Sequence, residues 1–168
     1  MKALDRNAKG VHLITDTPLA DDGTLDLGST GRMVDWYRAR GATGLTILGI
    51  MGEATKLTAE ESRAFVRQVL ARVAGQVPVI VGASAAGFAP MRELTTSVMD
   101  MGASGVMVAP APTLRTDEQI LAYFDMVADT LGPKVPWVLQ DHPVSTGVQM
   151  SPSVVTRILK TVPYTPLT

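Results

Sequence analysis

The segment from Gly49 to Glu53 (GIMGE) has the composition of a loop that can bind a small anion. Gly49 and Gly52 bracket two residues, so the backbone can turn tightly and expose consecutive N–H groups. A helical pattern begins shortly afterwards at Thr58, and N–H groups before a helix are suited to hold a carboxylate or a phosphate. A plain connecting turn is the simpler interpretation of the same residues. Glu53 could act as a base or could only brace the loop, and both interpretations stay open.

A second polar group, Gln140, Asp141 and His142, follows an apolar run near the end of the chain. Aspartate and histidine can form a proton-transfer pair. However, neighbours on an extended segment point to opposite sides, so joint action on one atom is the weaker interpretation. The other histidine, His12, lies inside an apolar run and is expected to be a packed interior residue. Because the two histidines show no ligand spacing and there are no cysteines, we expect no metal site, no cofactor and no cysteine nucleophile.

Five short apolar runs, bounded by Gly or Pro, recur at intervals of roughly thirty residues and predict buried strands. These strands are residues 11–15, 44–49, 77–82, 105–109 and 135–140. Amphipathic patterns predict helices at residues 28–40, 58–73, 90–101, 117–131 and 151–161. Thr58, with Glu61 three residues later, forms the sequence of a capping box at the start of the second helix. The regular alternation predicts parallel strands joined by right-handed crossovers.

Two architectures fit this alternation. A doubly wound sheet would normally carry a glycine-rich phosphate turn after its first strand, but that strand exits into Asp16-Thr17-Pro18. A TIM barrel needs no such turn, although it needs eight units and typically about 250 residues. We therefore predict an α/β fold: a partial TIM (β/α)₈ barrel of about five βα units, formed as one domain over residues 1–168. A small flavodoxin-like sheet stays open as the alternative. In either case function collects at the carboxyl ends of the strands.

The composition narrows the functional class. The chain is 46% hydrophobic but only 5% aromatic, so its core must be aliphatic, as in a parallel sheet covered by helices. The net charge of −1 provides no basic field for nucleic acid or for an anionic membrane. No apolar run approaches the ~18 residues of a membrane span, and the first residues lack a signal-peptide pattern. A cytoplasmic protein that binds neither nucleic acid nor membrane is expected.

Three motifs together resemble the dihydrodipicolinate synthase / N-acetylneuraminate lyase family. Residues 49–58 (GIMGEATKLT) resemble its G-T-T-G-E-x-x-x-L-T loop, and residues 140–147 (QDHPVSTG) resemble its Y-N-x-P-x-R-T-G segment. Asp16-Thr17-Pro18 resembles its T-P exit after the first strand. The resemblance covers nearly all of residues 8–163. It implies a TIM barrel with class I aldolase chemistry, in which a lysine on strand six forms a Schiff base with a 2-keto acid such as pyruvate.

The resemblance also implies roles for particular residues. The substrate carboxylate would be bound by Ile50, Met51, Gly52 and Glu53, and Gln140 stands at the position of a proton-relaying tyrosine. Ile50 and Met51 replace two threonines, so the hydroxyls are lost while the backbone N–H groups remain. An amide side chain cannot relay a proton as a phenol does. These departures argue against a true dihydrodipicolinate synthase and fit a divergent branch of the family whose substrate the sequence does not identify.

Further departures affect catalysis. Ser145 replaces an arginine of the motif, and Pro110-Ala111-Pro112 stands where the family often carries paired tyrosines. Counted from Gln140 with the family spacing, the resemblance implies a Schiff-base lysine at or just beyond residue 168. The lysines present do not fit this position: Lys134 precedes the fifth predicted strand and Lys160 lies on the last predicted helix. We therefore expect the N-terminal part of a keto-acid lyase, inactive alone. The alternative is a non-catalytic half-barrel module that forms a homo-oligomer or pairs with a full-length relative through the unpaired edges of its first and fifth strands.

Overall fold

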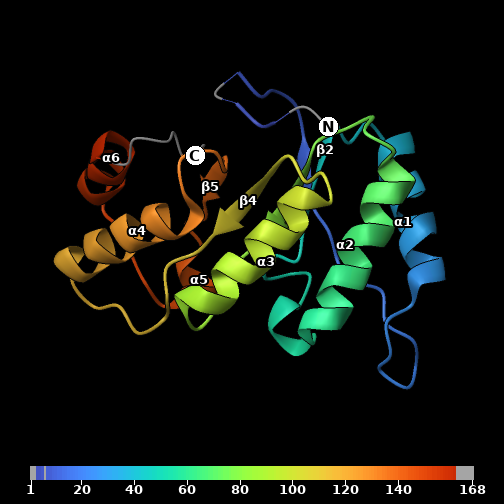
Figure 1. The fold of residues 1–168 in the computed structure, drawn as a ribbon, viewed down its shortest axis with the longest axis horizontal. Coiled ribbons are helices and arrows are strands. Elements are labelled where there is room, and N and C mark those ends of the chain that lie inside the picture. The colour runs from blue at the N-terminus through green and yellow to red at the C-terminus, as the bar shows by residue number, and fades with distance from the viewer. Residues whose placement is uncertain (1–2, 6, 162–168) are drawn as a thin grey trace.

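The computed structural model describes residues 3–5 and 7–161, and its centre is a sheet of five parallel strands (Figure 1). The strands are β1 (His12–Ile14), β2 (Gly44–Ile47), β3 (Val79–Gly82), β4 (Gly105–Val108) and β5 (Trp137–Leu139). Their order is β1-β2-β3-β4-β5, and each strand pairs in parallel with the next. This order confirms the partial barrel, because a flavodoxin-like sheet would have the order 2-1-3-4-5.

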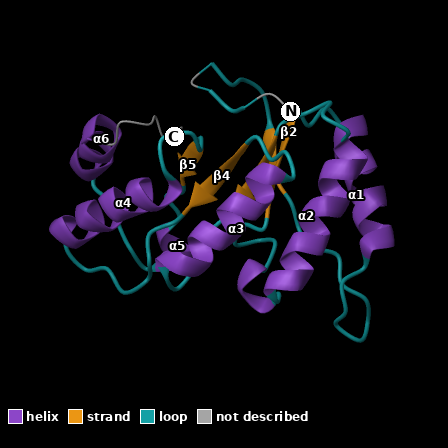
Figure 2. Ribbon diagram, viewed as in Figure 1, coloured by secondary structure: helices purple, strands orange, loops and turns teal. Residues whose placement is uncertain are grey.

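The helices lie along one face of this sheet (Figure 2). They are α1 (Leu27–Ala39), α2 (Ala59–Val73), α3 (Phe88–Asp100), α4 (Asp117–Leu131), α5 (Pro143–Thr146) and α6 (Pro152–Thr161), with a 3-10 helix η1 (Ala54–Lys56) between β2 and α2. The five long helices were predicted, whereas η1 and α5 were not, because three or four residues give no periodic pattern. None of the helices in the described ranges is long and apolar enough to cross a membrane.

Local signals set the helix starts. The Thr58 hydroxyl accepts a hydrogen bond from the Glu61 N–H, and the Glu61 carboxylate accepts one from the Thr58 N–H, which confirms the predicted capping box of α2. Thr116 and Gln119 form a second reciprocal box at the start of α4. Both boxes satisfy N–H groups that a helix start leaves without a partner. They also fix the points at which the β2 and β4 exit loops end.

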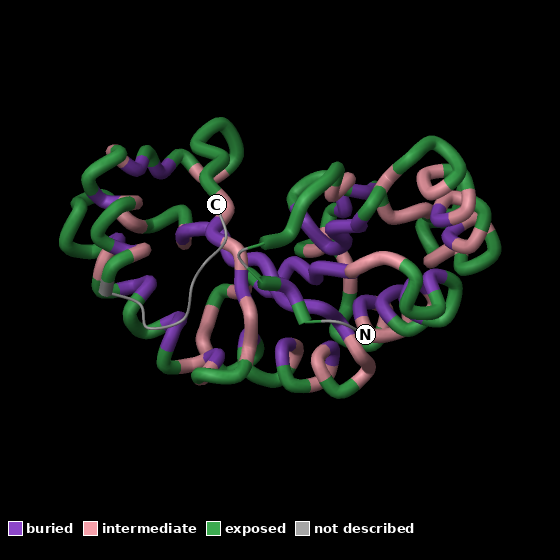
Figure 3. The backbone as a smooth tube through the Cα atoms, turned by 90° about the horizontal axis from the view of Figure 1, so that it is seen from above, coloured by how far each residue is buried: buried purple, intermediate pink, exposed green. Residues whose placement is uncertain are grey.

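The main core lies between the sheet and the helices. Alternate side chains of the strands, such as Leu45, Val79 and Val106, are fully buried on this side. On β5, Trp137 stacks on Phe124 of α4 with 6.0 Å between ring centroids. Aliphatic residues supply most of the rest, as the low aromatic content predicted. In the view from above, the buried strands form the centre of the molecule and the exposed loops surround them (Figure 3).

The inner face of the sheet is partly covered by the chain's own N-terminal segment. The Leu4 N–H donates to the Ser104 carbonyl at 2.8 Å, and the Leu4 side chain packs with Ile80 and Met107. These two residues are therefore almost fully buried. At the outer edge of the sheet, on and beside β1, Val11 is 61% exposed and Ile14 is 38% exposed. Exposed apolar surface is thus found at the unpaired β1 edge, while the middle of the inner face is closed.

Leu48, directly after β2, has a backbone conformation that is unusual for a side-chain-bearing residue. Its φ is +54°, in the left-handed region. Its carbonyl oxygen crosses the end of β3 so closely that a Cβ on Gly82 would lie 1.9 Å from it. Only glycine leaves room for this crossing. The β2 exit loop therefore depends on the missing side chain of Gly82.

Replacing Gly82 by alanine should destabilise the protein by about 2 kcal/mol or more, because the new methyl group collides with backbone rather than with a movable side chain. Gly31→Ala is the matched control. Gly31 lies inside α1, and the nearest atom to its added Cβ is 3.8 Å away. This variant should stabilise by roughly 0.5–1 kcal/mol through helix propensity. Urea unfolding followed by circular dichroism measures both, and equal effects of the two variants would contradict the crossing.

Candidate functional site

A cavity of about 240 Å³ opens at the carboxyl ends of β2 to β5. Residues at four consecutive strand ends contribute to it. They are Leu48, Gly49, Ile50, Ala54 and Thr55 after β2, Gly82 and Ser84 at β3, Met107, Ala109, Pro110 and Pro112 at β4, and Gln140, Ser145 and Thr146 after β5. We call it the mouth pocket. Its position is the one at which barrel enzymes carry their active sites.

Side-chain hydrogen bonds tie the neighbouring strand exits together. The Thr17 hydroxyl, after β1, donates to the Gly52 carbonyl at 2.7 Å. The Ser84 hydroxyl, after β3, accepts from the Ala109 N–H at 2.9 Å. The Tyr123 hydroxyl of α4 donates to the Ala109 carbonyl at 3.3 Å, and burial raises the pKa of this phenol, which keeps it a neutral donor. These bonds hold the β1 exit to the β2 exit, and the β3 exit to the β4 exit and α4, around the rim of the pocket.

The β2 exit loop presents free backbone donors at this rim. Among the hydrogen bonds of the described residues, none uses the N–H groups of residues 49–52, whereas the Glu53 N–H donates to the Ile50 carbonyl at 3.1 Å. Gly49 lies on the pocket floor: a Cβ there would be 3.4 Å from Met107 Cε and 3.5 Å from a methyl group of Ile14. Four consecutive donors without protein acceptors are what an anion-binding loop needs, and Gly49 and Ile50 bring two of them to the pocket lining.

The predicted binding residues occupy different places. Ile50 and Gln140 line the mouth pocket, but Met51 is 57% exposed and does not. Gly52 is buried, with its carbonyl bound by Thr17 as described above. The Glu53 carboxylate forms an ion pair with Lys56 at 2.5 Å and is also outside the lining. Of the two interpretations of Glu53, the structure therefore favours the loop brace.

Asp141 and His142 are both exposed, and neither side chain lines the pocket. The His142 carbonyl accepts from the Ser145 N–H at 3.1 Å and from the Thr146 hydroxyl at 3.3 Å, so this residue serves as the start of α5. The short helix turns Ser145 and Thr146 toward the pocket. No sequence pattern predicted Thr146 as a lining residue. Pro143 does fit the first position of a helix, which is where α5 begins.

No lysine of the described residues lines the mouth pocket, and Lys56, the nearest along the chain to its lining residues, is paired with Glu53. Within the same residues, no group of three or more His, Asp or Glu side chains could hold a metal ion. The pocket therefore offers backbone donors, hydroxyls and one amide. These groups can bind and orient a small anion, but they do not include an amine nucleophile.

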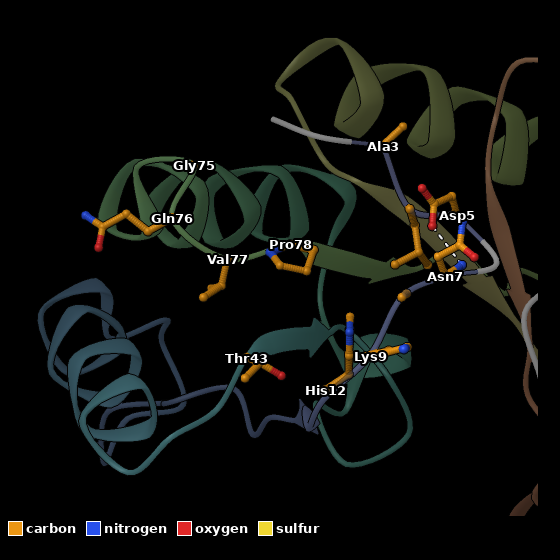
Figure 4. Close-up of a pocket in the computed structure, with 12 residues that line it drawn as sticks. Ala3, Asp5, Asn7, Lys9, His12, Thr43, Gly75, Gln76, Val77 and Pro78 are labelled. Atoms are coloured by element: carbon orange, nitrogen blue, oxygen red, sulfur yellow. Dashed lines mark hydrogen bonds between the residues drawn. The ribbon is translucent and has the colours of Figure 1, made fainter.

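A second cavity, of about 350 Å³, lies at the opposite, amino ends of the strands. Figure 4 shows residues around it from the N-terminal segment, the start of β1 and the turn before β3, among them Asp5, Asn7, Lys9, His12, Val77 and Pro78. The Nδ1 atom of His12 is buried without a hydrogen-bond partner and covers Gly44, in line with the packed interior role expected for this residue. Because residues at this end of a barrel serve stability, the cavity is not the candidate site.

The chain is similar in sequence to known enzymes over most of its length. Residues 7–164 match the dihydrodipicolinate synthetase family. The chain is 32% identical over 145 residues to a 4-hydroxy-tetrahydrodipicolinate synthase of Coxiella burnetii, covering 86% of this chain and 50% of that protein. It is 34% identical over 143 residues to the Gluconacetobacter diazotrophicus synthase. The chain thus spans about half the length of the curated relatives it matches.

Solved structures agree in fold. A dihydrodipicolinate synthase from Rhodopseudomonas palustris superposes with a TM-score of 0.93 at 46% identity, covering 98% of this chain and 54% of that one. A prophage protein of the dihydrodipicolinic acid synthase family from E. coli K12, solved in complex with pyruvate, superposes with a TM-score of 0.81 at 29% identity, covering 92% and 52%. Fold, strand-exit motifs and similarity over nearly the whole chain lead to one assignment: the chain belongs to the dihydrodipicolinate synthetase family.

Proposed function

We propose that this chain forms the carboxylate-binding part of a keto-acid lyase site. The observation that carries the proposal is the run of four backbone N–H groups without a protein acceptor, residues 49–52, of which Gly49 and Ile50 line the mouth pocket. A carboxylate satisfies such donors, and charge-assisted hydrogen bonds to it are stronger than neutral ones. The pyruvate complex of the E. coli relative supports a 2-keto acid as the ligand.

Binding is expected without catalysis in the isolated chain. Class I aldolase chemistry, which the family resemblance implies, needs an amine that attacks the ketone and becomes an electron sink. No lysine of the described residues lines the pocket. Gln140, at the position of the tyrosine, can hold the keto oxygen or a water molecule through its amide, but it has no proton to exchange near neutral pH. The chain would therefore position a keto acid and leave it unreacted.

Pyruvate titration tests the binding step. The backbone amide signals of residues 49–52 should shift in ¹⁵N-edited NMR spectra, with a dissociation constant in the millimolar range, because a few hydrogen bonds from one wall give little affinity. Methyl pyruvate carries the same ketone without the carboxylate, so it should leave these signals in place. Shifts that avoid residues 49–52, or equal shifts with the ester, would overturn the proposed loop function.

Borohydride trapping tests the catalytic step. Incubation with pyruvate and borohydride should add no mass at a specific residue, since no described lysine reaches the bound keto acid. A full-length family member serves as the positive control, because the resemblance implies that it carries the strand-six lysine. Stoichiometric trapping on one lysine of this chain, such as Lys56 beside the loop, would show that the chemistry lies elsewhere than proposed.

A second candidate function is that of a non-catalytic half-barrel that associates through its open edge. The observation that favours it is the exposure of Val11 and Ile14 at the unpaired edge of β1. An edge strand with exposed apolar side chains is a template for pairing with another chain. Association with a second copy or with a full-length relative would cover these residues, and the carboxylate loop could be retained in the assembly.

Sizing chromatography with light scattering tests this association. The chain should shift from monomer toward oligomer as its concentration rises, and Val11→Lys should weaken the shift because a charge blocks edge pairing. Val144→Lys is the control, since Val144 is 92% exposed on α5, away from the β1 edge. A monomer at every concentration would contradict the second candidate function, as would an equal effect of the two lysines.

A further inference from the structure

We propose that the mouth pocket selects 2-keto acids whose chain beyond the ketone is uncharged and apolar, against keto acids with a second carboxylate. This inference rests on the proposed function, because it takes the loop of residues 49–52 as the site of the first carboxylate. It concerns the remainder of the pocket, which must receive the rest of the ligand. Three properties of that remainder carry it: its apolar wall, the absence of cationic side chains from its lining, and the charge of the surrounding loops.

The wall beside the loop is hydrocarbon. Ile50 is 41% exposed and lines the pocket from the β2 exit, while Met107 forms part of its floor under Gly49. Pro110 and Pro112 continue the wall after β4. An apolar substituent placed against these side chains removes hydrocarbon surface from water on both partners, which is favourable in proportion to the area covered. The exposed part of Ile50 is the surface that such a substituent would cover.

The cations on the surrounding loops are already engaged. The mouth loops, residues 15–26, 48–58, 83–87, 109–116 and 140–151, contain one lysine and one arginine. Lys56 pairs with Glu53, and the Arg115 guanidinium donates to the carbonyls of Pro112 and Leu114, each at 2.7 Å. Neither side chain lines the pocket. A second carboxylate on the ligand would therefore find no charged partner among the described residues.

The same loops carry six carboxylates outside the pocket lining, so the net charge of these loops is negative. The six are Asp16, Asp21, Asp22, Asp26, Glu53 and Asp141. A negative field raises the free energy of a second anionic group brought to this end of the sheet. The polar side chains that do line the pocket, such as Ser84, Gln140 and Thr146, are uncharged. They can bind a keto oxygen, but they do not offset the desolvation of a second carboxylate.

Competing keto acids of similar size test the selectivity. We would titrate pyruvate, 4-methyl-2-oxopentanoate and 2-oxoglutarate into the ¹⁵N-labelled chain and follow the amides of residues 49–52. The branched apolar acid should bind about fivefold more tightly than pyruvate, since three added carbons are only partly buried. It should bind at least about tenfold more tightly than 2-oxoglutarate. Equal binding of the two longer acids, or a preference for 2-oxoglutarate, would overturn the inference.

A positive charge introduced into the pocket lining tests whether the lack of a cation there causes the selectivity. Ser145 is exposed and lines the pocket, so Ser145→Arg can be accommodated and would supply a cation there. This variant should raise the affinity for 2-oxoglutarate about tenfold and remove most of the preference for the apolar acid. Thr156→Arg adds the same charge on the exposed side of α6 and is the control for net charge alone. Equal effects of the two arginines would also overturn the inference.

The outcomes separate this inference from the proposed function. If none of the three acids shifts residues 49–52, the proposed function fails, and the selectivity inference fails with it. If all three shift these residues with equal affinity, the carboxylate loop stands and only the selectivity inference is wrong. The combination of loop shifts and a preference for the apolar acid supports both.

Discussion

The crossing of the Leu48 carbonyl over Gly82 fixes how the β2 exit meets the rest of the sheet. A left-handed residue turns the chain at the end of the strand, and the glycine of the neighbouring strand leaves the space that this turn needs. While Leu48 keeps this conformation, the following loop cannot continue as extended backbone in line with β2. Its N–H groups remain without protein acceptors. Backbone strain at one residue thus maintains donors at the rim, as is common where a loop binds a ligand.

The rim depends on hydrogen bonds between exits rather than on the loops' own packing. Thr17, Ser84 and Tyr123 each join one exit to another or to a helix behind it. These three hydroxyls bind backbone groups, and only Ser84 among them also lines the mouth pocket. The groups that hold the backbone are therefore largely separate from those that line the pocket. A site built this way can change its ligand without changing its fold.

Much of the fold could be predicted from the sequence. The five apolar runs, the capping residues Thr58 and Glu61 and the alternation of elements gave the strands and long helices, because these signals are periodic or local. The predicted strands are longer than the observed ones. The second predicted strand, for example, includes Leu48, where the backbone leaves the sheet and crosses Gly82 on β3. A periodic pattern in the sequence does not indicate such a contact between strands. The partial-barrel order is nonetheless confirmed.

The site was harder to predict in detail. Ile50 and Gln140 both line the mouth pocket, since strand exits converge in a barrel, but their roles in binding stay predictions. Met51 and Glu53 were grouped with them through the resemblance to the family loop. In the structure Glu53 has a left-handed φ, and its carboxylate pairs with Lys56. Ser145 and Thr146 reach the pocket from α5, a helix of a single turn that is too short to produce a periodic pattern in the sequence. Side-chain direction in irregular loops is set by tertiary contacts, so sequence spacing alone does not determine it.

The contact between Leu4 and Ser104 has a consequence for the order of folding. Each strand pairs with the next one along the chain, so most of the sheet can grow by successive local additions. The N-terminal segment is different, because its hydrogen bond partner lies at the start of β4 and its apolar partners on β3 and β4. During synthesis this segment must wait, unpaired, until β4 has formed. Its contacts can therefore form only once β4 is present, and the loop-closure entropy of the intervening chain falls on this step.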